Sequence, residues 1–304
     1  MLAVQLVTYF AVVVAVVAML VKVYRYATAP EHMRWELYPV PHEKGRAEYG
    51  GSYLEELDWW SKPRHSDKLN ELREMAAEII LLKGVFHHNR RVWRSSFPFH
   101  FGLYLCIGWL VMLLLGAVLQ AAGMSVAADA GGIGAIIHYL TIPLGYGGLV
   151  LGGLGALGLF IWRMSDDDQR PFNSPMEYFN LIFFVIVAAV TVIASAVADP
   201  SFTTLRAYVQ ALVTFGTAPV LTTWVAAEVI LLSLLILYIP LTRMSHFVAK
   251  YFLYHAVRWN DEPNVRGSKI EKRIAELLNQ KVGWTGAHIQ TGQTWGEVIK
   301  EPKK

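Results

Sequence analysis

Cysteine is nearly absent from this sequence: its 304 residues include only Cys106, which lies within an apolar run. A single cysteine excludes an intrachain disulfide, a Cys-x-x-Cys-His haem attachment and a four-cysteine iron–sulfur site. Any redox centre that this chain holds must therefore use other ligands.

Charged residues are also scarce, at 17% against 54% hydrophobic residues, which is typical of a multi-span membrane protein with soluble additions. No internal repeat and no period-two strand pattern is visible. A membrane-spanning helix needs ~20 apolar residues. Five runs are long enough: Leu2–Val21, Phe97–Ala122, Ala135–Trp162, Met176–Ala198 and Val220–Phe247. We therefore expect an all-α membrane protein, a bundle of five transmembrane helices.

Lysine and arginine are nearly missing from two connections, since 121–137 holds none and 199–219 holds only Arg206. The other 26 of 27 lie in 22–94, after Trp162 and in the tail from Arg243. Positive charge favours the cytoplasmic side, so we expect an outside N-terminus and a cytosolic C-terminus in the inner (cytoplasmic) membrane. Leu2–Val21 lacks a charged n-region and a cleavage motif, which favours a retained anchor over a signal peptide.

These patterns divide the chain into a first transmembrane helix (1–24), a cytosolic loop (25–96), a four-helix membrane region (97–249) and a cytosolic tail (250–304). In the loop, apolar residues at helical spacing follow a Ser66/Asp67 cap, and Gly84 is expected to end that helix. In the tail, Ser268-x-x-Glu271 is a capping box that opens a second helix. Neither apolar face has an evident core of its own, which favours docking of a partner protein.

Three further segments have simple interpretations. The basic, aromatic run from His87 to Arg94 is typical of anchoring to anionic headgroups. The segment Leu205–Phe215 is expected to form a short helix on the outer membrane surface. The third span is rich in glycine, including Gly148-x-x-x-Gly152, which favours either close helix approach or room for a flat cofactor.

The fifth span contains two ionisable residues, Glu228 and His246, with Pro240 between them. On one continuous helix they are five turns apart and share a face. Ionisable groups within a membrane helix normally face the bundle interior, so each is a candidate functional residue.

Histidine gives the clearest chemical signal. His100 lies near the start of the second span and His246 at the end of the fifth, and the two spans run in opposite directions, so both are predicted at the same cytosolic depth. Two such imidazoles can ligate the iron of haem b from opposite faces. Arg243 and Arg94 lie close enough in the chain to neutralise haem propionates. The simpler alternative is that both histidines are interfacial residues bonded to backbone or headgroups.

Two segments carry a family resemblance, Phe99-His100-Phe101-Gly102 and Pro240-Leu241-Thr242-Arg243-Met244-Ser245-His246. They resemble the haem-ligand segments of the cytochrome b (gamma) subunit of respiratory nitrate reductase. The long first loop and Met244–Trp259 look closer to its relatives in the Dsr, Hme and Tmc complexes of sulfur-metabolising organisms. The resemblance implies that His100 and His246 bind haem b, that 97–249 is the haem-binding region, and that the chain exchanges electrons between menaquinone and a heterodisulfide reductase-like cytosolic iron–sulfur subunit.

The sequence departs from that family at its outer haem, because the two corresponding ligand positions hold Leu110 and Glu228. His138 is the remaining intramembrane histidine. Three roles are open to it: ligand of a differently held second haem, hydrogen-bonding partner of a quinone, or a satisfied interfacial residue. Glu228 is either a catalytic proton acceptor from quinol or a carboxyl group that hydrogen-bonds a neighbouring helix.

We therefore expect a haem b-containing subunit of a respiratory quinone oxidoreductase complex. Its expected partners are the cytosolic iron–sulfur subunit, further membrane or periplasmic subunits including a c-type cytochrome, and the lipid bilayer, with no nucleic acid. The direction of electron flow is not encoded visibly. The rival interpretation is a non-redox membrane anchor or transporter subunit, although a transporter is expected to show repeats or paired broken helices.

Overall fold

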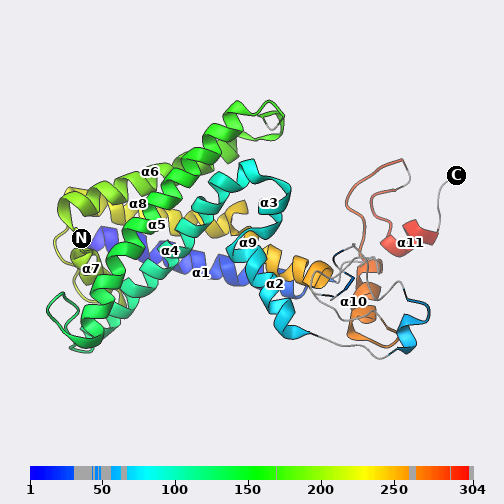
Figure 1. The fold of residues 1–304 in the computed structure, drawn as a ribbon, viewed down its shortest axis with the longest axis horizontal. Coiled ribbons are helices and arrows are strands. Elements are labelled where there is room, and N and C mark those ends of the chain that lie inside the picture. Colours follow the sequence, from blue (N-terminus) through cyan, green and yellow to red (C-terminus); the bar gives the residue numbers. More distant parts are fainter. Residues whose placement is uncertain are drawn as a thin grey trace. The chain divides into compact units, whose positions relative to one another are not determined.

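The computed structural model describes residues 1–30, 43, 45–46, 48, 56–62, 67–168, 170–259, 265–287 and 289–300. In these ranges the regular structure is helical, apart from two isolated bridges near the C-terminus (Figure 1). The predicted five spans are confirmed as helices long and apolar enough to cross a membrane: α1 (Leu2–Ala27), α4 (Arg90–Ala121), α5 (Gly132–Ser165), α6 (Pro175–Ala198) and α8 (Thr223–Leu241). The chain is a multi-pass helical membrane protein.

The chain forms two compact units. The bundle unit comprises 1–18 and 77–243, and the second unit comprises 19–76 and 244–304. These limits differ from the four segments expected at 1–24, 25–96, 97–249 and 250–304. One reason is that the end of the first loop packs with the bundle, where the Tyr104 hydroxyl donates to the Ile79 carbonyl at 2.7 Å.

In the bundle unit, α4 packs on α5, α5 on α6, and α6 on α8 (Figure 1). The α4–α5 contact is built from glycine. A Cβ on Gly102 would lie 2.6 Å from Gly152 Cα, and one on Gly155 would lie 2.6 Å from Phe99 Cα. The expectation of close helix approach is confirmed. At these positions α4 itself occupies the space, so they are not room for a flat cofactor.

The short helix expected between the fourth and fifth spans is α7 (Thr203–Val213). It is not a purely surface element, because Leu205, Arg206, Tyr208 and Ala211 are buried in it and it packs on α4. Its apolar residues join the main core with Trp109 and Val225. Sequence periodicity predicted the helix but not the burial of Arg206.

Polar side chains attach α1 to the rest of the bundle unit. Thr8 Oγ1 is hydrogen-bonded to Tyr208 Oη at 2.8 Å and to Ser233 Oγ at 2.9 Å. Gln5 Nε2 donates to the Gly216 carbonyl at 2.9 Å. Inside a bilayer these polar groups cannot bond to water, so hydrogen bonds between helices satisfy them.

The fifth span is shorter than predicted. α8 ends at Leu241, one residue after Pro240, and Thr242 is extended. The chain continues as η5 (Arg243–Ser245) and then as the separate helix α9 (His246–Ala249). Proline removes a backbone donor and disrupts the last helical turn. The prediction that Glu228 and His246 share one face of one continuous helix is therefore wrong.

The loop helix of the first connection is α2 (Lys68–Ile80). Of the expected Ser66/Asp67 cap, Asp67 is confirmed by a 3.1 Å bond from Asn70 N to Asp67 Oδ1, and Ser66 lies outside the described residues. Gly84 does not end it. The chain turns instead at Leu82, whose φ is 52°, and Gly84 lies in α3 (Lys83–His88). A left-handed leucine is uncommon, so a glycine-based rule could not find this end.

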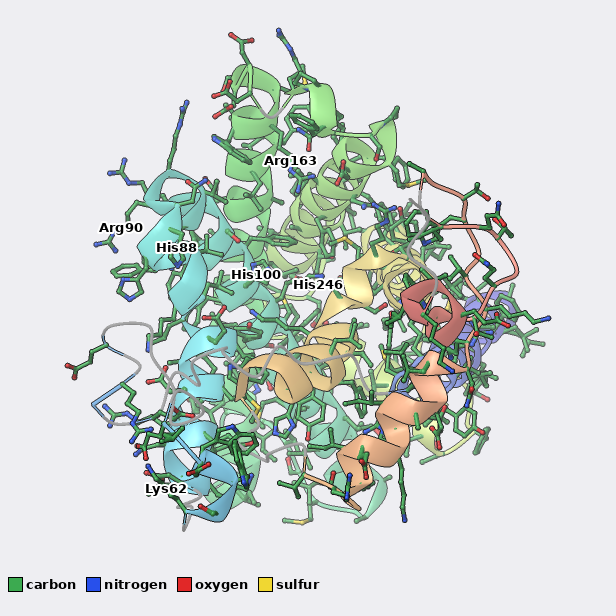
Figure 2. All side chains as sticks on the ribbon, turned by 90° about the vertical axis from the view of Figure 1, so that its right-hand side faces the viewer. Lys62, His88, Arg90, His100, Arg163 and His246 are labelled. Carbon is green, nitrogen blue, oxygen red and sulfur yellow. The ribbon has the colours of Figure 1, made fainter. Side chains whose placement is uncertain are left out.

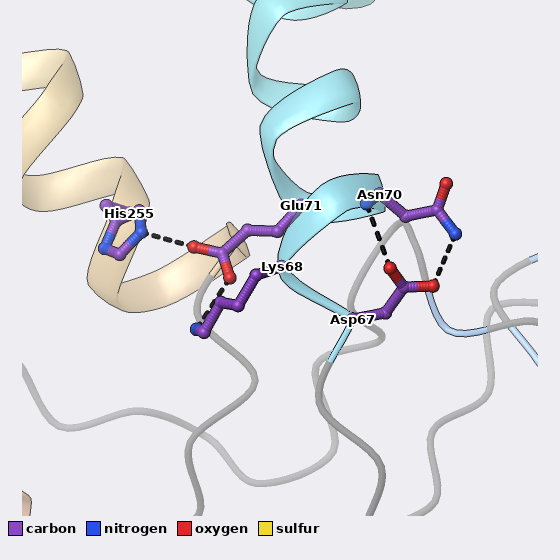
Figure 3. Close-up of polar contacts among 5 residues, drawn as sticks. All are labelled: Asp67, Lys68, Asn70, Glu71 and His255. Carbon is purple, nitrogen blue, oxygen red and sulfur yellow. Dashed lines mark hydrogen bonds and ion pairs between the residues drawn. The ribbon is translucent and has the colours of Figure 1, made fainter.

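Glu71 ties α2 to the tail in the second unit (Figure 3). Its carboxylate, 6% exposed, accepts from His255 Nε2 at 2.6 Å and from Lys68 Nζ at 2.8 Å. His255 belongs to the wide helix η6 (Lys250–Trp259), where Tyr251 stacks on its ring.

The tail helix is α10 (Lys269–Leu278), capped by Ser268 Oγ, which accepts from Glu271 N at 3.1 Å. A last helix, α11 (Trp295–Lys300), follows, and short 3₁₀ turns are η3 (Trp59–Ser61) and η4 (Arg170–Phe172). The tail does have a small core, contrary to expectation, because Val282 and Ile289 are 3% and 6% exposed.

Candidate functional site

His100 lies on α4 in the bundle unit and is labelled in Figure 2. Its Nδ1 is 2.7 Å from the Ser96 carbonyl oxygen, so the proton of a neutral ring belongs on Nδ1. The lone pair is then on Nε2, the atom that would coordinate iron. A metal-ligating histidine commonly donates its other ring N–H to a carboxylate, a backbone carbonyl or water. The chemistry of this side chain fits a haem ligand.

The other residues predicted at the inner haem are His246, Arg243 and Arg94. His246 begins α9 in the second unit and is exposed. Arg243 and Arg94 are exposed in the bundle unit. The pairing of His100 with His246, and the propionate roles of the two arginines, stay predictions from the sequence.

Glu228 is the most deeply buried carboxyl group of the bundle unit, at 1% exposed on α8. It faces α6, where Ser195 and Asp199 are its polar neighbours. The Ser195 hydroxyl interacts with the Glu228 carboxyl group, although neither Glu228 Oε1 nor Ser195 Oγ makes a protein hydrogen bond of good geometry. The side chain is interior, as predicted. Both predicted roles, proton acceptor and hydrogen-bonding partner of a neighbouring helix, stay predictions.

Asp199 lies next to Glu228 and caps α7. Its carboxylate accepts from Thr204 N at 3.0 Å and from Leu205 N at 2.9 Å. It is also the charged neighbour of Arg206, one residue further along α7. Asp199 is 5% exposed, so these backbone donors replace the water that a carboxylate normally binds.

Arg206 is fully buried, at 0% exposed. Its Nη1 donates to the Val126 carbonyl at 3.0 Å, but Nε and Nη2 have no partner in the protein. Burial lowers the pKa of this guanidinium, and Asp199 partly opposes that effect. The aliphatic part packs on α4, where a Cβ at Gly116 would lie 2.7 Å from Arg206 Cδ.

His138, on α5, lies beside Arg206 and is 9% exposed. Its Nδ1 is buried and has no protein partner. The role of a satisfied interfacial histidine therefore does not fit this nitrogen. The two other roles, haem ligand and quinone partner, are not distinguished by this geometry.

We call this group of buried side chains the Arg206 cluster and define it as Trp109, His138, Ser195, Asp199, Arg206 and Glu228. Trp109 adds a further buried donor, its indole Nε1, which has no partner. Trp109 and Phe202 are in contact at 5.1 Å between ring centroids, and both lie against Gly145. Glu228 and His138 are predicted from the sequence, whereas Arg206 and Asp199 are not. The available signal was the single arginine in an outer connection that otherwise lacks lysine and arginine.

A protein-only metal site is not evident: in the described ranges no three His, Cys, Asp or Glu side chains come together. That observation concerns ions held by side chains alone and does not bear on a haem with two axial ligands. No family model, curated protein or solved structure matches this chain. The resemblance to the nitrate reductase-type cytochrome b subunits therefore stays a prediction from its motifs.

Proposed function

We propose that this chain is a haem b-binding membrane subunit that passes electrons between menaquinol or menaquinone and a cytosolic iron–sulfur protein. The observation that carries the proposal is His100. It lies in the motif Phe99-His100-Phe101-Gly102, and its Nδ1 is bonded to the Ser96 carbonyl in the manner of a metal-ligating histidine.

The residues of the motif have separate tasks in this proposal. Phe99 and Gly102 fix α4 against α5, since both meet glycine backbone there. His100 and His246 would hold the haem through their imidazole nitrogens, with Arg94 and Arg243 as partners of the propionates. When bound, the haem supplies one-electron transfer, and the protein supplies its position and excludes solvent.

Glu228 is proposed as the group that accepts a proton from quinol. Its carboxyl group is interior, on a helix of the bundle, with the Ser195 hydroxyl as its polar neighbour. A proton acceptor must lie within hydrogen-bond reach of the proton that it takes. We place the quinone head group beside Glu228 and His138 for this reason.

The second unit is proposed to dock the iron–sulfur partner. Trp284 is 52% exposed in the tail, and the apolar face of α10 is half-buried. Exposed apolar side chains on a cytosolic tail are typical of an interaction surface. On the same family resemblance we propose other membrane or periplasmic subunits as partners, including a c-type cytochrome. The proposed inner membrane location rests on the distribution of lysine and arginine.

A reduced-minus-oxidised visible spectrum of the purified chain tests the proposal. Haem b with two histidine ligands gives the sharp bands of a low-spin cytochrome. A spectrum without such bands, after expression with sufficient haem, would favour the rival function of a non-redox anchor or transporter subunit.

A further inference from the structure

The Arg206 cluster contains several buried polar atoms that have no protein hydrogen bond of good geometry. Within the cluster, the buried atoms without a protein partner are Trp109 Nε1, His138 Nδ1, Ser195 Oγ, Arg206 Nε and Nη2, and Glu228 Oε1. Thr191 Oγ1, one turn before Ser195 on α6, is a further such atom. Each buried polar atom left unpaired destabilises the folded state. If all of these atoms lacked a hydrogen-bond partner, the folded protein would be much less stable.

These atoms are of mixed type, which decides what can satisfy them. Arg206 and Trp109 offer only N–H donors, whereas an ionised Glu228 offers only acceptors, and the two hydroxyl groups can do either. An ion of one sign could serve the donors or the acceptors but not both. Water serves both, and buried water typically makes about three hydrogen bonds to such groups.

The cluster extends across the bundle unit. Electrostatic interactions link Glu228 with Asp199, Asp199 with Arg206, and Arg206 with His138, and bonds from Thr204 N and Leu205 N hold the Asp199 carboxylate at the start of α7, beside Arg206 in the chain. Packing agrees with this order, because a Cβ at Gly116 would meet both Arg206 and Ile137, the residue before His138. The series ends at the connection between α4 and α5. There Arg206 Nη1 bonds Val126, and the exposed Asp129 is the next charged neighbour of His138.

We propose that ordered water fills the Arg206 cluster and connects Glu228 to solvent at the 122–131 connection, as the route by which a proton leaves Glu228. That the proton comes from quinol rests on the proposed function; the water route does not. In each transfer the Glu228 O–H bond breaks, the proton passes to the neighbouring water, and the hydrogen-bond chain releases one proton beside Asp129. Glu228 is left as a carboxylate, and no electron moves in this step.

Arg206 does not carry the proton, because a guanidinium stays protonated in proteins. Its fixed charge orients the surrounding water, and the negative charge of Asp199 stabilises it electrostatically. Asp199 is itself fixed by the backbone donors Thr204 N and Leu205 N. Both are positioning residues for the water chain.

Hydroxyl-radical labelling, with radicals generated from water by an X-ray pulse and read by mass spectrometry, tests the hydration of the cluster. The full chain in lipid nanodiscs offers a matched pair, because Trp109 and Trp259 are each 1% exposed. The indole Nε1 of Trp259 is not among the buried atoms without a partner. We expect Trp109 to be oxidised several-fold faster than Trp259. Equal or slower oxidation of Trp109 would overturn the proposal.

Infrared spectroscopy tests the route. The carbonyl band of protonated Glu228 is identified by its loss in Glu228→Gln, and its shift after transfer to D₂O gives the rate of exchange with solvent. We expect Ser195→Ala and Arg206→Met to slow that exchange several-fold. Thr8→Val, which removes a buried hydroxyl outside the cluster, should leave it unchanged.

Two infrared results would contradict the route. One is an unchanged exchange rate in Ser195→Ala, the small substitution least able to disturb folding. The other is the absence of a Glu228 band at any pH, since Glu228 would then never hold a proton. Neither experiment uses haem or quinone, so a chain without haem can still pass both, and a haem-binding chain can fail both.

Discussion

Gly102 lies directly against Gly152, so α4 and α5 meet backbone to backbone one half-turn beyond His100. A Cβ on Gly102 would stand 2.6 Å from Gly152 Cα and 2.7 Å from the Gly148 carbonyl oxygen. A Cβ on Gly152 would instead find its nearest atoms, on Gly102, at 3.9 Å, an ordinary contact. The two partners in one contact therefore differ sharply in the space that they leave for a side chain.

Gly102→Ala is accordingly expected to destabilise the bundle by about 1–3 kcal/mol, because α4 and α5 must move apart to admit the methyl group. Thermal unfolding of the purified chain measures this as a lower midpoint. Gly152→Ala is the matched control and should have little effect. Equal midpoints for the two variants would contradict the packing described here.

His255→Ala should loosen α2 from the tail, because the nearly buried Glu71 carboxylate would keep only Lys68 as a side-chain partner. Losing a hydrogen bond to a buried charged group costs about 1–3 kcal/mol. Amide hydrogen exchange over residues 68–76 should rise.

The control for His255 is Lys62→Ala, which breaks the exposed pair with Glu56 at 2.8 Å. Exposed pairs contribute about 0–1 kcal/mol, so exchange in that variant should change little. Protection of α2 that is unaffected by His255→Ala would show that the Glu71 contact does not hold the helix.

Removal of the tail after Trp259 is expected to weaken the complex with the cytosolic iron–sulfur subunit and to leave haem content intact. The deletion removes α10, the small core around Val282 and the exposed Trp284. Trp284→Ala is the finer variant, since it changes only the exposed surface. Co-purification of both variants with the partner at wild-type levels would place the docking surface elsewhere.

Glu228→Gln should keep the inner haem but reduce it slowly with a menaquinol analogue, because glutamine keeps the shape of the side chain and cannot accept the proton. Stopped-flow absorbance of the haem measures the rate. Ser233→Ala is the control, since Ser233 lies on the same helix, is 2% exposed and has its hydroxyl bonded to Thr8. Wild-type kinetics in Glu228→Gln at every pH would show that Glu228 has only a packing role. The quinone site would then be expected on the cytosolic side, near His87, His88 and Arg91.

The sequence predicted the elements better than it predicted their ends and their burial. Hydropathy alone located the five spans, because each must satisfy its backbone internally and present apolar side chains to lipid. It could not place the end of α8, where Pro240 and the extended Thr242 separate Glu228 from His246. It also missed the end of α2, which uses a left-handed leucine in place of a glycine.

The candidate site was predicted in part. Glu228 and His138 could be found because an ionisable residue in an apolar span is conspicuous. Arg206 was counted only as a charge in a connection, since nothing local indicates that α7 folds into the core. Its burial depends on contacts with Gly116 and Val126, which are distant in the sequence. Such long-range contacts cannot be read from periodicity.

The haem content of three histidine variants tests the central claim most directly. Haem b per chain should be measured in the wild type, His100→Ala, His246→Ala and His88→Ala, the last being an exposed histidine outside the spans. We predict at least one low-spin haem b in the wild type and in His88→Ala, and loss of the inner haem in the other two. An unchanged haem content in both His100→Ala and His246→Ala would contradict the account.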